Sequence, residues 1–266
     1  MSAEAVLEVA IDAARRGGEL LMEHRRRGVS GVMTKTSNTD LVSDADRAAE
    51  KLIVGLIAES FPDDGIVGEE GASTEGTSGR RWIVDPLDGT TNFVYGFDAF
   101  CVSVGVEDES GPFVGCVHDP SRGETFSAVR GGGADLDGER IQPTTASDLA
   151  QALVGTGFSY RSDQREWQAA VVSHLLPRVR DIRRVGSAAL DLCWVATGRL
   201  DAHVERGLAP WDHAAGALIA AEAGASIFRP SPTAVWGLVM AAAPGIAVEL
   251  FNLVGAAEQL AGPRPE

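Results

Sequence analysis

Residues 82–93 read Trp-Ile-Val-Asp-Pro-Leu-Asp-Gly-Thr-Thr-Asn-Phe, and this stretch decides how the rest of the chain is interpreted. Three apolar residues of strand character lead into Asp85, and Pro86, which has no N–H to donate, is expected to end the strand. Asp88 follows three residues after Asp85, and residues 89–91 offer a flexible backbone, two hydroxyls and a helix start. Two carboxylates beside free backbone N–H groups suit hard cations with a phosphate bridged to them.

A purely structural explanation of the same stretch is a turn. The Asp-Gly pair at 88–89 would supply the loop geometry, and Thr90 or Thr91 would cap a helix. Two distant acidic motifs favour the chemical interpretation. Gly-Glu-Glu at 68–70 follows an apolar pair, and Trp-Asp at 211–212 lies far downstream. We therefore expect acids at three strand or helix ends to converge on one site.

Composition and charge limit the possible partners. The chain has 266 residues, of which 44% are hydrophobic and 23% charged, as expected for a globular protein with a sizeable core. The formal net charge is −15, from 23 Lys and Arg against 38 Asp and Glu, so nucleic acid is an improbable partner. An anionic substrate would need local positive charge, and bound divalent metal is the simplest source.

Three cysteines, Cys101, Cys116 and Cys193, stand in apolar settings without a C-x-x-C pair. Buried free thiols suit a reducing compartment. No stretch approaches the roughly 18 consecutive apolar residues of a membrane span. Charged residues also interrupt the N-terminal apolar positions, which argues against a secretory leader. We expect a cytoplasmic protein with no membrane association.

Hydrophobic periodicity divides the chain into two lobes, residues 1–148 and 149–266. The first lobe should contain two helices, loops at 31–42 and 71–81, and an antiparallel meander. Its helices are expected at 3–27 and at 44–60 after a Ser43 cap, and its meander strands at 100–107, 112–118 and 123–130. In the second lobe strands alternate with helices, which indicates an α/β arrangement. Its strands are expected at 153–156, 182–185, 201–205, 225–228 and 235–242, and its helices at 163–179, 187–198, 211–223 and 244–260.

With the motifs at 68–70, 82–93 and 211–212 in hand, the sequence resembles the inositol monophosphatase family of metal-dependent, lithium-sensitive sugar phosphatases. The likeness runs from about Leu20 to the final helix, and segments 185–192 and 223–225 match in the right order. The resemblance implies an α/β fold with an α+β first lobe, arranged as the layered αβαβα sandwich of the inositol monophosphatase and fructose-1,6-bisphosphatase type. It also implies a homodimer.

The resemblance further implies two or three Mg²⁺ ions per site. The positions that match the family's metal ligands are Glu69, Asp85, the Leu87 carbonyl oxygen, Asp88 and Asp212. Lys35 falls where the family has a mobile-loop lysine, although a solvated lysine is the alternative. Asp46 matches an acid associated with metal and lithium response.

Around the substrate, the resemblance places the phosphate on a turn and the sugar hydroxyls on the second lobe. The phosphate-binding positions are Gly89, Thr90 and Thr91, and the hydroxyl-contacting positions are Arg183, Ala188 and Glu205. Arg183 and Arg184 could each face substrate, a subunit interface or solvent, and Arg183 is favoured for substrate. One departure lies at 228–233, where the family commonly has a longer turn with an aspartate and a glycine.

The expected reaction is hydrolysis of a phosphate monoester by direct attack of water. Two Mg²⁺ ions about 3.5–4 Å apart can neutralise charge on both the attacking and the leaving oxygen. Asp85 and Asp88 would share the ions, while Glu69 and Asp212 would each hold one. Glu69 with Thr90 would orient and deprotonate the water, so no covalent intermediate is required.

Inositol 1-phosphate is the predicted substrate, because Glu205 would prefer neutral hydroxyls over a second phosphate. Other small phosphates of related enzymes remain alternatives: fructose 1,6-bisphosphate, histidinol phosphate and 3′-phosphoadenosine 5′-phosphate. A haloacid dehalogenase-like mechanism, with Asp85 as nucleophile, is a rival, but the spacing is one residue too long and Pro86 intrudes. A regulatory protein that retains the fold without catalysis is the alternative from another class.

Overall fold

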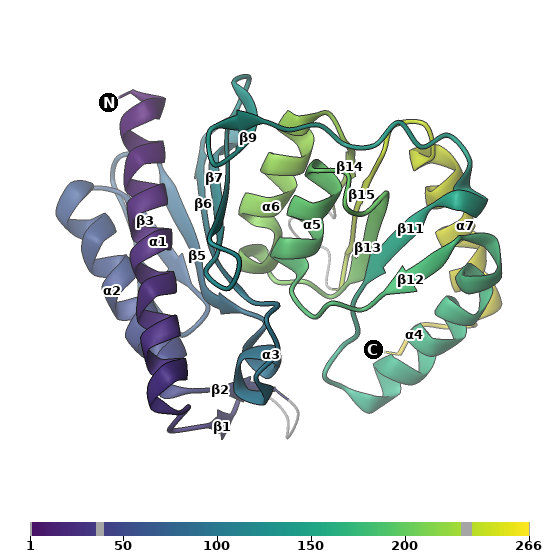
Figure 1. Ribbon diagram of the computed structural model, residues 1–266, viewed down its shortest axis with the longest axis horizontal. Coiled ribbons are helices and arrows are strands. Elements are labelled where there is room, and N and C mark those ends of the chain that lie inside the picture. The colour runs from purple at the N-terminus through teal and green to yellow at the C-terminus, as the bar shows by residue number, and fades with distance from the viewer. Residues whose placement is uncertain (1, 36–39, 230–235, 266) are drawn as a thin grey trace.

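The fold stacks five layers, with helices and sheets alternating (Figure 1). The computed structural model describes residues 2–35, 40–229 and 236–265. Helices α1 (Ala3–Arg27) and α2 (Asp44–Ser60) form the first layer, and α5 (Ala188–Ala196) and α6 (Pro210–Ala223) lie between the two sheets. Helices α4 (Ser162–Leu175) and α7 (Ala247–Leu260) cover the far side of the second sheet. The predicted αβαβα sandwich is therefore confirmed.

The first sheet has eight strands in the order β10-β9-β8-β7-β6-β5-β3-β4. Its strands are β3 (Gly65–Gly68), β4 (Ser73–Thr74), β5 (Arg81–Asp88), β6 (Cys101–Asp108), β7 (Gly111–Asp119), β8 (Glu124–Val129), β9 (Gly133–Leu136) and β10 (Glu139–Arg140). Consecutive strands β5 to β10 pair antiparallel, which confirms the predicted meander, whereas β3 pairs parallel to β5. The parallel pair brings the ends of β3 and β5, and thus two acidic motifs, to the same edge.

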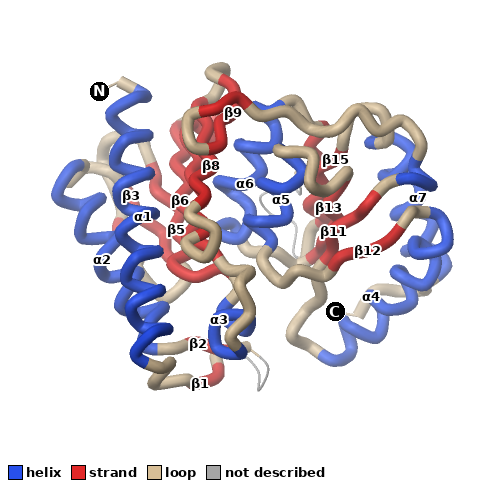
Figure 2. The backbone as a smooth tube through the Cα atoms, in the orientation of Figure 1, coloured by secondary structure: helices blue, strands red, loops and turns tan. Residues whose placement is uncertain are grey.

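The second sheet has five strands in the order β12-β11-β13-β15-β14. They are β11 (Leu153–Thr156), β12 (Asp181–Arg183), β13 (Ala202–Arg206), β14 (Ser226–Phe228) and β15 (Leu238–Ala242). Strand β11 runs parallel to both β12 and β13, because each connection passes through a helix (Figure 2). The predicted lobe boundary at 148/149 falls in the chain between β10 and β11.

Two local expectations were wrong. Strand β5 does not end at Asp85 but continues to Asp88, with a register shift between these residues where β5 pairs with β6. Proline is tolerated there because a bulge already interrupts the ladder of hydrogen bonds. The expected loop at 31–42 contains a short antiparallel pair, β1 (Met33–Thr34) and β2 (Leu41–Val42). Residues 36–39 of that loop, and residues 230–233 of the turn predicted to depart from the family, lie outside the described residues.

Helix α6 lies directly on the first sheet because two glycines leave room for it. Gly105 of β6 and Gly115 of β7 are paired across the strands. A Cβ built on Gly115 would stand 2.8 Å from the carbonyl oxygen of Ala215 in α6, and that backbone cannot yield as a flexible side chain would. This contact sets the position of the N-terminus of α6, which carries Asp212.

The three cysteines are buried free thiols, as predicted. Within the described part of the chain, no helix is long and apolar enough to cross a membrane.

Replacing Gly115 by alanine should lower the free energy of unfolding by about 1–3 kcal/mol, because the new methyl group overpacks the contact with α6. Gly55→Ala is the matched control. Gly55 lies in α2, and nothing approaches its built Cβ within 4 Å, so alanine there should stabilise the helix by up to about 1 kcal/mol. Denaturant unfolding of both variants tests this. Equal effects of the two substitutions would contradict the proposed close contact.

Candidate active site

A cavity of about 490 Å³ opens where the ends of β3 and β5 face the second sheet. This volume is in the range of small-molecule sites. Its walls include ten of the thirteen residues predicted for the site. These ten are Lys35, Glu69, Asp85, Leu87, Asp88, Gly89, Thr90, Ala188, Glu205 and Asp212. The acids of the three separate sequence motifs therefore line a single cavity.

Glu69 lies in the turn after β3, and a second acid holds this turn in place. The two carboxylate oxygens of Glu50 in α2 accept hydrogen bonds from the backbone N–H groups of Glu70, at 2.8 Å, and Ala72, at 3.1 Å. The Glu69 side chain accepts a hydrogen bond from Lys35 at 2.8 Å, and Lys35 also contacts Glu70 at 2.5 Å. Lys35 thus supplies positive charge directly beside Glu69.

The bulge in β5 aims Asp85 and the backbone around Leu87 at the cavity. Oδ1 of the buried Asp85 accepts the N–H of Leu87 at 3.0 Å. The Leu87 carbonyl oxygen lies 3.1 Å from the hydroxyl of Thr90. The strand irregularity therefore presents both a carboxylate and a backbone carbonyl, two oxygen donors suited to a hard cation.

Asp88 is held by the start of α5, which belongs to the other half of the chain. Its Oδ2 accepts hydrogen bonds from the Ser187 hydroxyl and from the Ala189 N–H, both at 2.7 Å. Ser187 is the N-cap of α5 and also accepts the N–H of Leu190. The N-terminal end of a helix favours negative charge, so this contact stabilises an ionised Asp88.

Asp212 occupies the first turn of α6. Its carboxylate accepts the N–H of Ala209 at 2.6 Å, which fixes the side chain at the helix start. The Ser103 hydroxyl of β6 donates to the carbonyl oxygen of Trp211 at 3.3 Å. The first sheet therefore fixes the position of Asp212 through both packing and a hydrogen bond.

Asp46 lies behind Thr90 and does not line the cavity. It is fully buried, accepts the N–H and hydroxyl of Ser43, and accepts the Thr90 hydroxyl at 3.0 Å. Gly89, with φ of 99°, begins the six-residue helix α3 (Thr90–Tyr95) in a left-handed conformation that glycine adopts readily. Asp46 thus orients the threonine of the predicted phosphate turn.

Of the three positions predicted to contact substrate hydroxyls, the structure brings Ala188 and Glu205 to the cavity but not Arg183. Arg183 forms an ion pair with Asp181 at 2.6 Å, and its side chain is half exposed. The next residue, Arg184, lines the cavity instead. Thr91 lies outside the cavity wall and lines a neighbouring hollow. Alternation along an extended chain explains the exchange of roles between the two adjacent arginines.

Burial and mutual repulsion raise the pKa values of the clustered acids. Burial, followed by the charges of Glu69 and Asp88, raises the pKa of Asp85 well above its usual range. Burial and the charge of Asp88 do the same to the pKa of Asp212. Burial raises the pKa of Asp88 to about 7, although its hydrogen bonds from Ser187 and Ala189 act in the opposite direction. These carboxylates would be fully ionised at neutral pH only with added positive charge among them.

The donor set fits a hard divalent cation. Four carboxylates and a carbonyl oxygen face one cavity, and the charges of the neighbouring acids raise the pKa values of Asp85 and Asp212. Among the described residues, no three His, Cys, Asp or Glu side chains already stand in an arrangement that could hold a metal ion. The acids share a cavity rather than a closed cage, and Lys35 pairs with Glu69 there.

Sequence reasoning missed several residues that complete the site. Ser187 and Glu50 act through hydrogen bonds to Asp88 and to the turn after β3, and their sequence signals are only those of a cap and a helix face. Tyr160 lines the cavity from the loop before α4. Only the pairing of distant elements reveals these three roles.

A layered αβαβα fold whose acids and glycine-threonine turn share one cavity defines a class of metal-dependent phosphatases. The model of the inositol monophosphatase family matches residues 2–260. The chain belongs to this family.

Relatives and solved structures agree with this assignment. Mycobacterium tuberculosis inositol-1-monophosphatase SuhB is 47% identical over 235 residues, which cover 84% of this chain and 81% of that protein. The Nus factor SuhB of Escherichia coli K12 is 41% identical, with coverage of 82% and 83% respectively. The structure of a Thermotoga maritima IMPase matches with a TM-score of 0.87 at 34% identity, and the match covers 96% of this chain and 99% of that one.

The raised pKa of Asp88 predicts that this residue lowers stability as the pH rises. An unfolded aspartate loses its proton near pH 4, whereas folded Asp88 keeps it to about pH 7. Between these values the folded state binds more protons, so the contribution of Asp88 to the free energy of unfolding falls as pH rises. In chelator-treated protein, Asp88→Asn should therefore flatten the decline of melting temperature between pH 4 and 7. Parallel pH profiles for the two proteins would contradict the raised pKa.

Proposed function

We propose that this protein is a Mg²⁺-dependent phosphomonoesterase that hydrolyses inositol 1-phosphate to inositol and phosphate. The observation that carries the proposal is the convergence of Glu69, Asp85, Asp88 and Asp212 on one cavity beside the turn at 89–91. Membership of the inositol monophosphatase family supports a phosphatase, and the acidic lining supports a metal-assisted reaction.

Two or three Mg²⁺ ions would be held by Glu69, Asp85, the Leu87 carbonyl, Asp88 and Asp212. When bound, they supply positive charge against the phosphate oxygens and so favour both attack on phosphorus and departure of the alcohol. Lys35, whose ammonium already pairs with Glu69, adds positive charge at the same side.

The chain's own residues would position the reacting groups. The backbone of Gly89 and the Thr90 region would bind the phosphate at the start of α3, together with the more peripheral Thr91. The Thr90 hydroxyl donates toward Asp46 and the Leu87 carbonyl, so the lone pairs of its oxygen can accept a hydrogen bond from the attacking water. Glu69 would take that water's proton as the new P–O bond forms and the ester P–O bond breaks. Direct transfer to water leaves Asp85 free of any covalent role.

Glu205 and the Ala188 backbone region would contact the hydroxyls of the polyol. A carboxylate accepts hydrogen bonds from neutral hydroxyls and repels a second phosphate, which favours a monophosphate. Arg184, which lines the cavity, would contact the substrate hydroxyls in place of Arg183. Fructose 1,6-bisphosphate, histidinol phosphate and 3′-phosphoadenosine 5′-phosphate are the alternative substrates for the same chemistry.

Three further properties belong to the proposal through the family resemblance: a homodimer, sensitivity to lithium, and a location in the cytoplasm. The three buried free thiols support a reducing compartment.

A regulatory role is the alternative, and several similar proteins, among them that of Escherichia coli K12, bear the name Nus factor SuhB. In that role the chain would contact other proteins or RNA without catalysis. The complete set of cavity acids favours catalysis, and a net charge of −15 opposes RNA binding.

Phosphate release from a panel of monophosphates in the presence of Mg²⁺ tests the proposed activity. Inositol 1-phosphate should be the best substrate, and Asp88→Asn should lower kcat/KM by at least about 100-fold because it removes a charged ligand. Asp12→Asn, an exposed change on α1, is the control and should have no effect. A folded protein that binds Mg²⁺ but releases no phosphate would favour the regulatory alternative. A trapped phospho-aspartate at Asp85 would favour the haloacid dehalogenase-like mechanism.

Mg²⁺ should raise the melting temperature, because binding only to the folded state stabilises it. Glu50→Gln should weaken this effect and lower Mg²⁺ affinity about 10–100-fold, since an amide cannot accept hydrogen bonds at both positions from the turn that carries Glu69. Glu59→Gln, on the exposed end of the same helix, is the matched control. Isothermal titration with Mg²⁺ measures both variants, and equal affinities would contradict a positioning role for Glu50.

A further inference from the structure

A chain of three ionisable side chains runs from the interior of the second half to the cavity. His203 is fully buried in β13, with Nδ1 3.2 Å from Oδ2 of Asp191 in α5. Its Nε2 lies 3.6 Å from Oε2 of Glu205, which lines the cavity. Asp191 is 1% exposed and the Glu205 side chain 13% exposed. The imidazole therefore stands between two carboxylates, one deep in the protein and one facing the substrate site.

Two glycines leave room for these three side chains. His203 and Glu205 alternate along β13 and so point to the same face of the sheet. On the neighbouring strand β11, Gly155 is paired with His203. A Cβ on Gly155 would stand 3.1 Å from the Asp191 carboxylate, and one on Gly157 would stand 2.0 Å from Glu205. The two glycines therefore leave the space that the carboxylates of Asp191 and Glu205 occupy.

The positions of the carboxylates favour a doubly protonated imidazole. A neutral imidazole can donate from only one ring nitrogen, whereas an imidazolium donates from both. Both nitrogens of His203 face carboxylate oxygens, and within the described residues neither has a hydrogen-bond partner of good geometry. Ionic attraction is therefore the interaction that compensates for their burial.

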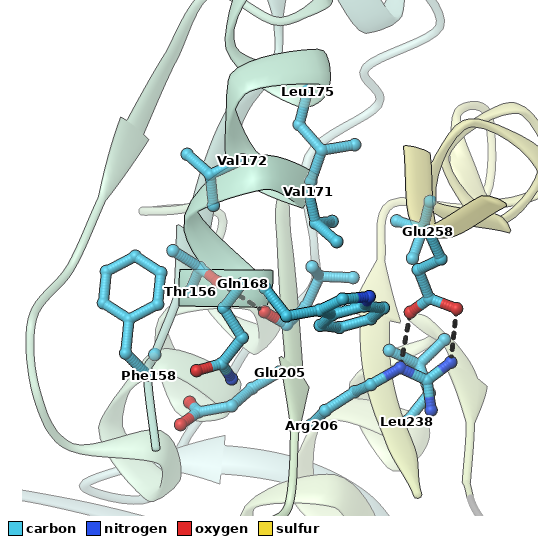
Figure 3. Close-up of a pocket in the computed structure, with 14 residues that line it drawn as sticks. Thr156, Phe158, Gln168, Val171, Val172, Leu175, Glu205, Arg206, Leu238 and Glu258 are labelled. Atoms are coloured by element: carbon cyan, nitrogen blue, oxygen red, sulfur yellow. Dashed lines mark hydrogen bonds and ion pairs between the residues drawn. The ribbon is translucent and has the colours of Figure 1, made fainter. Parts of the chain in front are cut away.

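Other charged groups near the series do not take the place of His203. Arg206, the neighbour of Glu205 in β13, is committed to Glu258 of α7, with Nη2 2.7 Å from Oε2 (Figure 3). Asp191 of α5 and, more weakly, Asp88 of β5 oppose ionisation of Glu205, while Arg184, from the segment after β12, favours it. Gln168 of α4 also lies near Glu205 in the adjoining apolar pocket (Figure 3), but an amide carries no charge.

We propose that His203, held as an imidazolium between Asp191 and Glu205, is a positioning residue that keeps Glu205 ionised and aimed at the substrate, and thereby selects for a polyol. This inference rests on the proposed phosphatase function and deepens it by naming the determinant of substrate class. His203 does not touch the reacting phosphate, so it acts through Glu205 on recognition of the alcohol portion.

The pKa directions agree with the geometry. Burial lowers the pKa of His203, but the negative charge of the adjacent Asp191 carboxylate outweighs it, so the net pKa is raised. Burial raises the pKa of Glu205 to about 7, and the positive charge of His203 acts against a larger rise. Hydroxyl donors from a bound polyol would favour the ionised Glu205 further.

Steady-state kinetics with two esters separates this role from a general structural one. One substrate is inositol 1-phosphate, and the other is 4-nitrophenyl phosphate, which lacks polyol hydroxyls. His203→Phe should raise KM for inositol 1-phosphate about tenfold, equivalent to roughly 1.4 kcal/mol, with little change in kcat. Hydrolysis of 4-nitrophenyl phosphate should change little. A parallel loss with both substrates would overturn the proposal.

Matched variants sharpen the kinetic test. His118 is another buried histidine in a strand, and it forms a hydrogen bond with Thr125 in the first sheet. His118→Phe should leave the preference between the two esters unchanged. In a Glu205→Gln background, His203→Phe should have no further effect, because its route of action is already removed. Additive effects of the two substitutions would contradict action through Glu205. If His203→Phe fails to fold, the double variant with Asp191→Asn removes the buried unpaired carboxylate and permits the same measurement.

Nitrogen NMR of histidine-labelled protein tests the charge state without reference to activity. The resonances of His203 are assigned by their loss in the folded His203→Phe variant, or in its double variant with Asp191→Asn. Both ring nitrogens should be protonated at pH 7. An unprotonated ring nitrogen would overturn the inference even if the enzyme is active. If the native protein hydrolyses neither ester while both ring nitrogens are protonated, the proposed function fails. The charged state of His203 between Asp191 and Glu205 is then still supported.

Discussion

The structure depends on holding several carboxylates close together in a partly buried cavity. Like charges repel strongly where water is scarce, and here burial and repulsion together raise the pKa values of Asp85, Asp88 and Asp212. Such an arrangement persists only if the surrounding fold fixes each acid independently. The two sheets and the helix layer between them provide that rigidity, at a cost in stability that cation binding would offset.

Asp85, Asp88 and Asp212 are each anchored by a backbone donor from a different element. The bulge in β5 supplies the N–H of Leu87 to Asp85, the start of α5 supplies that of Ala189 to Asp88, and the start of α6 supplies that of Ala209 to Asp212. Helix starts and strand irregularities leave backbone N–H groups unpaired within the element itself. Backbone N–H groups that have no partner within their own helix or strand therefore orient the carboxylates, which repel one another.

The layered fold and the main acids were predictable because they leave local signals. Apolar periodicity marked most helices and strands, and the acids follow apolar runs or begin helices. The strand through Pro86 was mispredicted, because a bulge depends on the partner strand β6 and not on the proline alone. The exchange of Arg183 for Arg184 at the cavity was missed for a similar reason, since a one-residue offset reverses which side chain faces inward. Supporting contacts such as that of Glu50 join elements whose proximity no local pattern encodes.

The hydrogen bonds from Ser187 and Ala189 to Asp88 join the two halves of the chain at the acidic cavity. The Asp88 carboxylate of the first sheet is therefore held in a fixed position, or register, against the start of α5 in the second half. Recombination between this protein and a relative, with the crossover between the halves, would yield a working cavity only when that register is preserved. The two halves are thus expected to diverge as a matched pair, with insertions tolerated in outer loops and not at the junction of β5 with α5.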